Sequence, residues 1–350
     1  MHMADALISV PVGFTMWAVS AGTIAYCSKK VRREQDDTKA PLMGVLGAFL
    51  FAAQMINFTI PATGSSGHIG GGLLLSILLG PYAAFLTIAS VLVVQALFFA
   101  DGGLLALGCN IFNMGFLTAF VAYPLIYKKI VGKHPTPSRI TLGAIVGGVI
   151  GLQLGAFSVV LETVFSGISL LPFSTFVLFM QPIHLGIGFV EGFIIAAIVA
   201  FVYKARPEIL LNVRQAKPFG TLPLSNIIIT FCALAFITGG FVSWYASTKP
   251  DGLEWAIRKV TGKDKLEASG EGVYGAFASI QEKLTVLPDY NFKKPAVKKQ
   301  NLPVGASMAG STRGEGGKLG TSVAGIVGGI ITLGLTLVIG VIVRKLPAIS

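Results

Sequence analysis

This sequence has few charged residues. Only 12% of its 350 residues are Asp, Glu, Lys or Arg, whereas soluble domains carry roughly 25%. Hydrophobic residues make up 53%, and the mean hydropathy is +0.75. This composition excludes an ordinary soluble domain and predicts a protein that crosses a membrane several times. Residues 1–7 have no basic region, so we expect no secretory signal.

Reactive residues are also scarce. Cys27, Cys109 and Cys232 are scattered in apolar runs, so they predict neither a disulfide nor a metal site, and we expect buried neutral thiols. No nucleophile–base set and no zinc-protease helix motif is visible. We therefore expect a chain that is not an enzyme, hydrolyses no ATP itself, and holds no redox or organic cofactor.

The net charge of +11 invites comparison with nucleic-acid-binding proteins, but the placement of the basic residues argues against nucleic acid. Fifteen of the 27 Lys and Arg residues flank apolar runs, in the clusters 29–39, 128–139, 204–217 and 344–345. Cytoplasmic loops carry such an excess of basic residues. The clusters therefore indicate a membrane topology, with a lipid bilayer as the surroundings.

Nine apolar runs alternate with these clusters. We expect spans at residues 7–27, 41–60, 71–79, 82–100, 111–127, 140–165, 173–203, 224–245 and 321–343. Gly80-Pro81 divides the third run from the fourth, because proline breaks a helix interior. The run at 71–79 is too short to cross alone, so it must pack within the bundle.

These runs predict an all-α polytopic membrane protein made of two modules. Residues 1–217 form a seven-span helical bundle with one short span. Residues 218–350 form an accessory module with spans at 224–245 and 321–343 and an extracytoplasmic segment at 246–320. The basic clusters place the amino terminus outside and the carboxyl terminus in the cytoplasm.

The extracytoplasmic segment contains two helix signals. Asp251 and Glu254 are spaced as a capping box at a helix start. A second helix is expected over residues 274–287, ended by Pro288, and residues 288–320 have the composition of a flexible linker.

The candidate metal site begins with Met1 and His2. A terminal amine, the backbone nitrogen of His2 and its imidazole can chelate one ion through small closed rings. The bulky His2 also disfavours removal of Met1. A second imidazole, His68, lies on a Gly- and Ser-rich loop that the topology puts on the same side. Four nitrogens in a plane suit Ni(II) or Cu(II).

Other polar residues are expected near this level of the bundle. Asn57 at the end of the second span, Ser66 in the His68 loop, and Asn110 and Asn113 after the turn at 101–103 are candidates for holding the ligands in place. Ordinary hydrogen bonding between helices is the alternative.

Two further residues, His184 and Glu191, are seven positions apart and therefore share a helix face. An acidic residue within a span is by default a functional hypothesis, although a structural hydrogen-bonding role explains Glu191 equally well. Glu162 is expected near the outer end of its span, in contact with water. Gly143, Gly147, Gly151 and Gly155 predict a smooth helix face for close packing.

The combination of these motifs resembles the CbiM/NikM family, the substrate-binding membrane components of energy-coupling-factor transporters for cobalt and nickel. The resemblance is carried by Met1-His2, the loop 63–71, the residues 102–110, and His184 to Gly192. Residues 218–350, with Pro250-Asp251-Gly252-Leu253-Glu254, resemble the small accessory component that accompanies them. Residues 3–6, Met-Ala-Asp-Ala, depart from the pattern of many members.

The resemblance implies a location in a prokaryotic cytoplasmic membrane and a function in metal import. Ni(II), or alternatively Co(II), is held as transported substrate by the Met1 amine, His2 and His68. A transmembrane coupling subunit and a cytoplasmic ATPase are the implied partners. The alternatives are an ATP-independent secondary cation transporter or channel, whose usual sign is several membrane-embedded carboxylates, and a membrane metalloenzyme.

Overall fold

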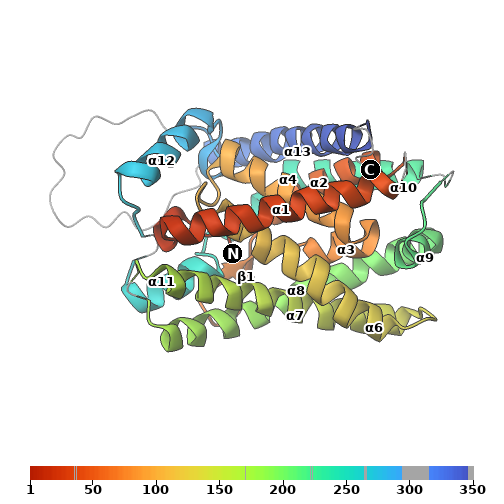
Figure 1. Cartoon of the computed structure of the whole chain (residues 1–350), viewed down its shortest axis with the longest axis horizontal. Helices are drawn as coiled ribbons and strands as arrows, with labels where there is room; N and C mark the ends of the chain where they lie inside the picture. The colour runs from red at the N-terminus through yellow and green to blue at the C-terminus, as the bar shows by residue number, and fades with distance from the viewer. Residues whose placement is uncertain are drawn as a thin grey trace.

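The computed structural model of the chain is almost entirely helical, as predicted (Figure 1). It describes residues 1–34, 36, 38–169, 171–220, 222, 224–263, 266–293 and 315–345. The α-helices of the first module are α1 (Val10–Glu34), α2 (Lys39–Gln54), α3 (Gly72–Leu79), α4 (Pro81–Phe99), α5 (Leu107–Ile111), α6 (Lys128–Val131), α7 (Pro137–Ser166), α8 (Phe173–Ala205) and α9 (Pro207–Gln215). The remaining α-helices are α10 (Ser225–Gly240), α11 (Gly252–Thr261), α12 (Gly272–Leu284) and α13 (Glu315–Lys345).

Short elements complete the chain. They are the 3-10 helices η1 (Asp5–Leu7), η3 (Val242–Tyr245) and η4 (Pro288–Tyr290), the π-helical stretch η2 (Phe112–Tyr127), and the strands β1 (Phe58–Ile60) and β2 (Ser65–Gly67). The strands pair antiparallel, with Thr59 opposite Ser66.

Among the residues that the structure describes, six helical stretches are long and apolar enough to cross a membrane: Val10–Glu34, Pro81–Phe99, Leu107–Val131, Pro137–Ser166, Phe173–Ala205 and Gly317–Val343. The shorter apolar helices α2 and α10 and the buried α3 occupy the places of the other expected spans. In Figure 1, α11 and α12 lie at one end of the bundle and α6 and α9 at the other. We call the former the site end.

The predicted break at Gly80-Pro81 is confirmed. Gly80 has φ +83°, a conformation that glycine adopts at no steric cost, and it ends α3. Pro81 then begins α4, where its missing N–H is not needed. All eight residues of α3 are buried, so this short helix lies inside the bundle, as its length required.

Glycines bring α7 against its neighbours. A Cβ atom added at Gly192 of α8 would lie 2.6 Å from Cα of Ile145 in α7, so the two helices pack backbone against backbone. The predicted smooth face of α7 is confirmed. Gly143, Gly147 and Gly151 lie against side chains of α3, η2 and α6, and a Cβ atom at Gly155 would lie 3.0 Å from Asn113 O.

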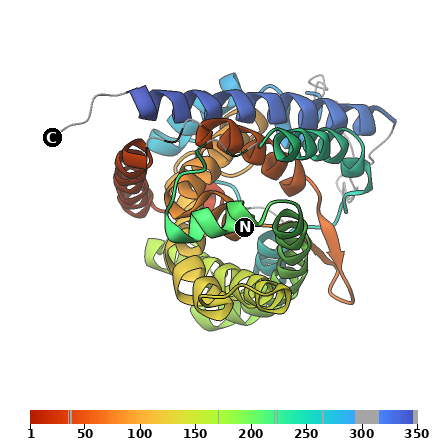
Figure 2. The ribbon, with the colours of Figure 1, turned by 90° about the vertical axis from the view of Figure 1, so that its right-hand side faces the viewer.

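The helices of the accessory region pack on α2. Helix α13 lies against α2 and α10, and α10 also contacts α2. A Cβ atom at Gly239 would lie 3.0 Å from the carbonyl carbon of Gly325, so α10 and α13 also touch through their backbones. Seen from the end in Figure 2, α13 lies across one side of the bundle and α7 with α8 across the opposite side.

Three local expectations were wrong. The second span ends at Gln54, and residues 58–67 form the β1–β2 hairpin, because Thr63 and Gly64 make a turn between two short extended runs. Cys232 of α10 is exposed, whereas all three thiols were expected to be buried. Helix α13 begins at Glu315, within the expected linker; residues 294–314 of that linker lie outside the described residues.

Replacing Gly192 tests the contact between α7 and α8. Gly192→Ala inserts a methyl group against the backbone of Ile145, and we expect it to lower the free energy of unfolding by about 1–3 kcal/mol. Gly22→Ala in α1 meets no atom within 4 Å and is the matched control, with an expected gain of about 0.5–1 kcal/mol. Thermal unfolding in one detergent compares them; equal melting temperatures would contradict the contact.

Candidate metal centre

The first three residues run into the protein and are held there by Asn110. Its Oδ1 accepts from Met3 N at 2.8 Å, and its Nδ2 donates to Met3 O at 3.2 Å. Gly103 N donates to the same carbonyl at 2.9 Å. A Cβ atom at Gly102 would lie 2.9 Å from Nδ2 of Asn110, so the turn that follows α4 requires glycine there. The terminal segment is thereby fixed along its backbone.

His2 faces His68. The two ring centroids are 5.1 Å apart and the planes are 25° from parallel. His2 Nε2 lies 3.1 Å from Gln95 Oε1, and Nδ1 lies 3.4 Å from Asp101 Oδ1. The sequence prediction that Met1-His2 and the His68 loop lie on the same side agrees with this arrangement.

The His68 loop is held from inside the bundle by Glu191. Its carboxylate accepts from Gly70 N at 2.9 Å and from Gly71 N at 2.8 Å. Glu191 therefore has the structural hydrogen-bonding role that the sequence left open. His68 Nδ1 is 3.0 Å from Ile69 O. Because a carbonyl only accepts, Nδ1 carries the proton and Nε2 keeps its lone pair.

His184 is 1% exposed and lies beside the same residues. Its Nδ1 donates to Met180 O at 2.7 Å, so Nε2 is an acceptor, and among the described residues it has no hydrogen-bond partner. It lines a small cavity with Met1, His68 and Asp251. Gly252 also lines that cavity, and a Cβ atom added there would lie 3.2 Å from His184 Nε2.

The terminal amine faces a carboxylate from the accessory region. Met1 N is 3.4 Å from Asp251 Oδ2. Asp251 caps α11, accepting from Glu254 N at 2.8 Å, and the predicted capping box is confirmed. Burial opposes ionisation of Asp251, but the terminal ammonium and the Glu254 N–H outweigh it and hold the pKa of this carboxyl below its usual range.

Two predicted supporting residues contact the accessory region instead of the candidate ligands Met1, His2 and His68. Ser66 Oγ donates to Lys249 O at 2.7 Å, and Ser66 N donates to Pro250 O at 2.8 Å. The backbone carbonyl of Asn57 accepts from Ser247 N at 2.7 Å. Both residues therefore join the β1–β2 hairpin to the segment that precedes α11.

Asn113 lies beneath the terminal segment. Its Nδ2 donates to Glu162 Oε2 at 2.7 Å and lies 3.7 Å from Met3 Sδ. The expectation that water surrounds Glu162 was wrong, because this residue is only 6% exposed. The helix face that carries Glu162 turns toward η2, so its position near the end of α7 does not bring it to the surface.

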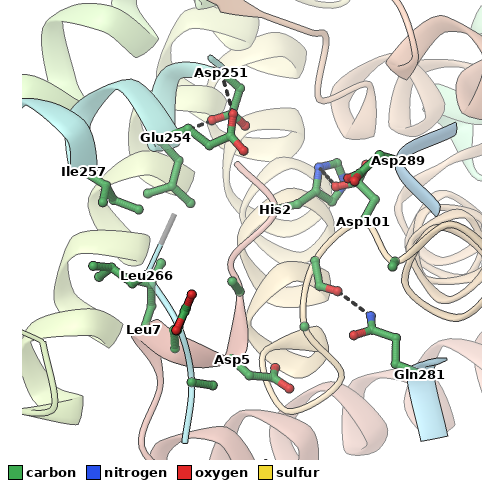
Figure 3. A pocket seen from close by; sticks show the side chains of 18 of the residues that line it. His2, Asp5, Leu7, Asp101, Asp251, Glu254, Ile257, Leu266, Gln281 and Asp289 are labelled. Carbon is green, nitrogen blue, oxygen red and sulfur yellow. Dashed lines mark hydrogen bonds and ion pairs between the residues drawn. The ribbon is translucent and has the colours of Figure 1, made fainter. Parts of the chain in front are cut away.

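An open cavity of about 730 Å³ leads to His2 (Figure 3). Carboxylates from both modules line it, among them Asp5, Asp101, Asp251 and Glu254. The His2 ring points toward Asp101 in Figure 3, and Asp251 with Glu254 forms a separate part of the wall. An acidic entrance favours the approach of cations.

The sequence analysis missed four residues at the centre. Gln54, Gln95 and Asp101 hold or face His2, and Tyr290 donates to Asp101 Oδ2 at 2.5 Å. The only available signals were two polar residues inside apolar helices and an acidic residue at an outer turn. Asp251 was found as a helix cap, but no local pattern connects it to a residue 250 positions away.

Comparison with known proteins identifies the family. The model described as the cobalt uptake substrate-specific transmembrane region matches residues 2–209, and the PDGLE domain matches residues 225–345. The chain belongs to the CbiM family. It joins a CbiM/NikM-type component to a NikN-like component in one polypeptide.

Individual relatives agree with this. The fused nickel transport protein NikMN of Rhodobacter capsulatus is 31% identical over 327 residues, 87% of this chain and 91% of that protein. The cobalt transport protein CbiM of Sorangium cellulosum is 28% identical over 60% of this chain and 94% of its own length. A solved transition metal transporter superposes with a TM-score of 0.53 at 28% identity, covering 61% of this chain and 99% of that one.

The buried imidazoles predict an acid-sensitive metal-free protein. Burial, then the terminal ammonium and His2, lowers the pKa of His68 to about 3, and burial also lowers the pKa of His2. Unfolded histidines protonate near 6.5. The unfolded state therefore binds more protons below pH 6.5, so stability is complete above that pH and is lost as the pH falls toward the folded values.

Acidification from pH 7.5 to pH 5 should thus lower the free energy of unfolding by up to about 2 kcal/mol through His68. Melting temperatures of the metal-free protein would measure this, and His68→Gln should reduce the loss. The exposed His134 supplies the matched control, His134→Gln, which should leave it unchanged. A pH response equal in all three proteins would contradict neutral burial of His68.

Proposed function

We propose that this chain binds a divalent transition metal, most strongly Ni(II), and passes it inward as the substrate-specific component of an ATP-driven energy-coupling-factor transporter. The proposed ligands are the Met1 amine, the backbone nitrogen and Nδ1 of His2, and Nε2 of His68. The observation that carries the proposal is the 5.1 Å approach of the His2 and His68 rings, with Met1 lining the small cavity beside His68.

The ligand set explains why side chains alone form no metal cluster. Over the described ranges of the chain, no three His, Cys, Asp or Glu side chains are grouped to hold an ion. The proposed site needs only two imidazoles, because the amine and a backbone nitrogen supply the other donors. A deprotonated backbone nitrogen is a strong-field ligand that favours a planar arrangement, which suits d⁸ Ni(II) better than Co(II).

The orientation and the partners follow from the same proposal. We place the site end outside the cytoplasmic membrane, because the basic clusters flank the other ends of the spans. Hydrated ions then enter through the acidic cavity, and a transmembrane coupling subunit with a cytoplasmic ATPase drives release on the far side. The boundary between the metal-binding region and the accessory region is placed at residues 217–218.

A secondary cation transporter is the runner-up. Its usual sign is a path of carboxylates across the membrane, and the two acidic side chains buried in α7 and α8, Glu162 and Glu191, are each hydrogen-bonded to protein groups. This bonding suits fixed structural roles better than ion transfer. A metalloenzyme is disfavoured because the relatives are named as transporters.

The terminal amine and His68 are tested by two changes. One residue added ahead of Met1 moves the amine away from the chelate, and His68→Ala removes the fourth nitrogen. We expect each to weaken Ni(II) binding by more than about 100-fold, since even residues that only support a ligand cost 10- to 100-fold. Calorimetric titration measures this, with His134→Ala as the control. Wild-type affinity in the extended protein would remove the amine from the site.

Metal uptake tests the transport mechanism and the choice of ion. Cells expressing this chain with its coupling subunit and ATPase should accumulate radioactive nickel more than cobalt at equal concentrations. Omitting the ATPase should abolish uptake. Cobalt entering faster than nickel would reverse the assignment of the ion, and uptake that persists without the ATPase would favour the secondary transporter.

A further inference from the structure

Two glutamines form a hydrogen-bonded chain behind His2. Gln54 of α2 and Gln95 of α4 are 4% and 0% exposed. Gln54 Nε2 donates to Gly70 O at 2.9 Å, and Gln95 Nε2 donates to Gln54 Oε1 at 2.8 Å. Gln95 Oε1 then lies 3.1 Å from His2 Nε2. The chain thus runs from the His68 loop to the His2 ring.

The Gly70 carbonyl determines which group donates and which accepts in each of these hydrogen bonds. A backbone carbonyl only accepts, so the amide nitrogen of Gln54 must face Gly70 and its oxygen must face Gln95. Gln95 in turn presents its oxygen to His2. Reversing either amide would set oxygen against oxygen or nitrogen against nitrogen. His2 Nε2 is therefore the donor and carries the proton.

The other ring nitrogen makes no hydrogen bond that requires it to carry a proton. His2 Nδ1 is 3.4 Å from Asp101 Oδ1, beyond the 2.7–3.2 Å of an N–H···O hydrogen bond, whereas the contact of Nε2 with Gln95 is within it. Nδ1 is also the nitrogen that closes a six-membered ring when a metal binds the backbone nitrogen of the same residue. The more distant Nε2 cannot close so small a ring.

We propose that Gln95, oriented by Gln54, is a positioning residue that holds His2 in its Nε2–H tautomer and so directs the Nδ1 lone pair to the metal. This inference rests on the proposed function, because the tautomer matters only if Nδ1 of His2 binds the metal. The proton on His2 Nε2 itself follows from the hydrogen bonds alone.

The same hydrogen bonds through Gln54 and Gln95 also influence the distance between the imidazoles of His2 and His68. Gly70 is held on both sides of its backbone, with its N–H on Glu191 and its carbonyl on Gln54. Gly70 follows His68 by two residues, so Gln54 and Gln95 connect the position of the His68 loop to the orientation of the His2 ring. Loss of either glutamine would loosen both ligands together.

Nitrogen NMR tests the tautomer directly. The full chain contains only four histidines, so ¹⁵N-histidine labelling in a nanodisc gives few signals, and single His→Gln variants assign them. We expect His2 to be protonated at Nε2 only, and His68 at Nδ1 only, in the metal-free protein at neutral pH. An Nδ1–H or doubly protonated His2 would overturn the proposal.

Variants at position 95 test its consequence. Gln95→Leu removes the acceptor, and we expect a mixture of His2 tautomers and Ni(II) affinity lowered by about 10- to 100-fold. Gln95→Glu in its protonated form donates to Gln54 Oε1 and keeps an acceptor oxygen toward His2, so it should retain the tautomer and more of the affinity. The matched control is Gln153→Leu, because Gln153 is a half-buried glutamine of α7 that donates to Gln181 O at 2.9 Å.

The outcomes separate the two proposals. If a folded Gln95→Leu protein keeps the wild-type tautomer and the wild-type Ni(II) affinity, the positioning role is overturned. Binding of Ni(II) by the wild-type protein then leaves the proposed function intact. A wild-type protein that binds no Ni(II), yet shows Nε2–H at His2, would overturn the proposed function instead. If Gln95→Leu does not fold, the spectra of the wild type and of Gln95→Glu test the positioning role. Loss of the His2 tautomer in Gln95→Glu would contradict that role.

Discussion

The arrangement at the site end depends on holding residues 1–3 inside the protein. Removing an ammonium group from water is costly unless an opposite charge or acceptors accompany it. Asp251 lies 3.4 Å from the terminal nitrogen, and Asn110 holds the backbone of Met3 from both sides. Asn110 and Gly103 hold this terminal segment along its backbone, and the accessory region reaches it through Asp251.

The accessory region is part of that arrangement rather than an appendage. Between residues 246 and 290 it contacts each segment that borders the terminal residues. Trp255 Nε1 donates to Thr63 O in the hairpin, Tyr274 donates to Ile8 O, and Gln281 Nε2 donates to Gly102 O, at 2.9, 2.9 and 2.8 Å. The segment with α11 and α12 therefore covers the site, while α10 and α13 anchor it to α2.

Much of this fold follows from local sequence. Helical runs, the break at Gly80-Pro81 and the capping box at Asp251 each depend on neighbouring residues, so the sequence predicts them. The hairpin at 58–67 was missed because three-residue strands are too short for a periodic pattern. The burial of Glu162 was missed because position along a helix does not reveal which face meets another helix.

The sequence predicts the ligands that we propose for the candidate site, but it does not predict the residues that hold them. Met1-His2 is a chelate by covalent structure alone, and topology put His68 on the same side. Gln54 and Gln95 are single amides in apolar helices, and their sequence neighbours do not distinguish a contact with His2 from a contact with another helix. The pairing of Met1 with Asp251 is likewise a product of the tertiary fold.

Under the proposed function, those supports also determine what release of the ion requires. Gly70 is bonded to Glu191 of α8 and to Gln54 of α2, and Gln95 of α4 carries the connection to His2. A displacement of α8 relative to α2 must therefore strain or break a bond at Gly70. Since His68 lies two residues from Gly70, that displacement changes its distance from His2. The hydrogen bonds at Gly70 and Gln95 thus couple the positions of His68 and His2 to α2, α4 and α8.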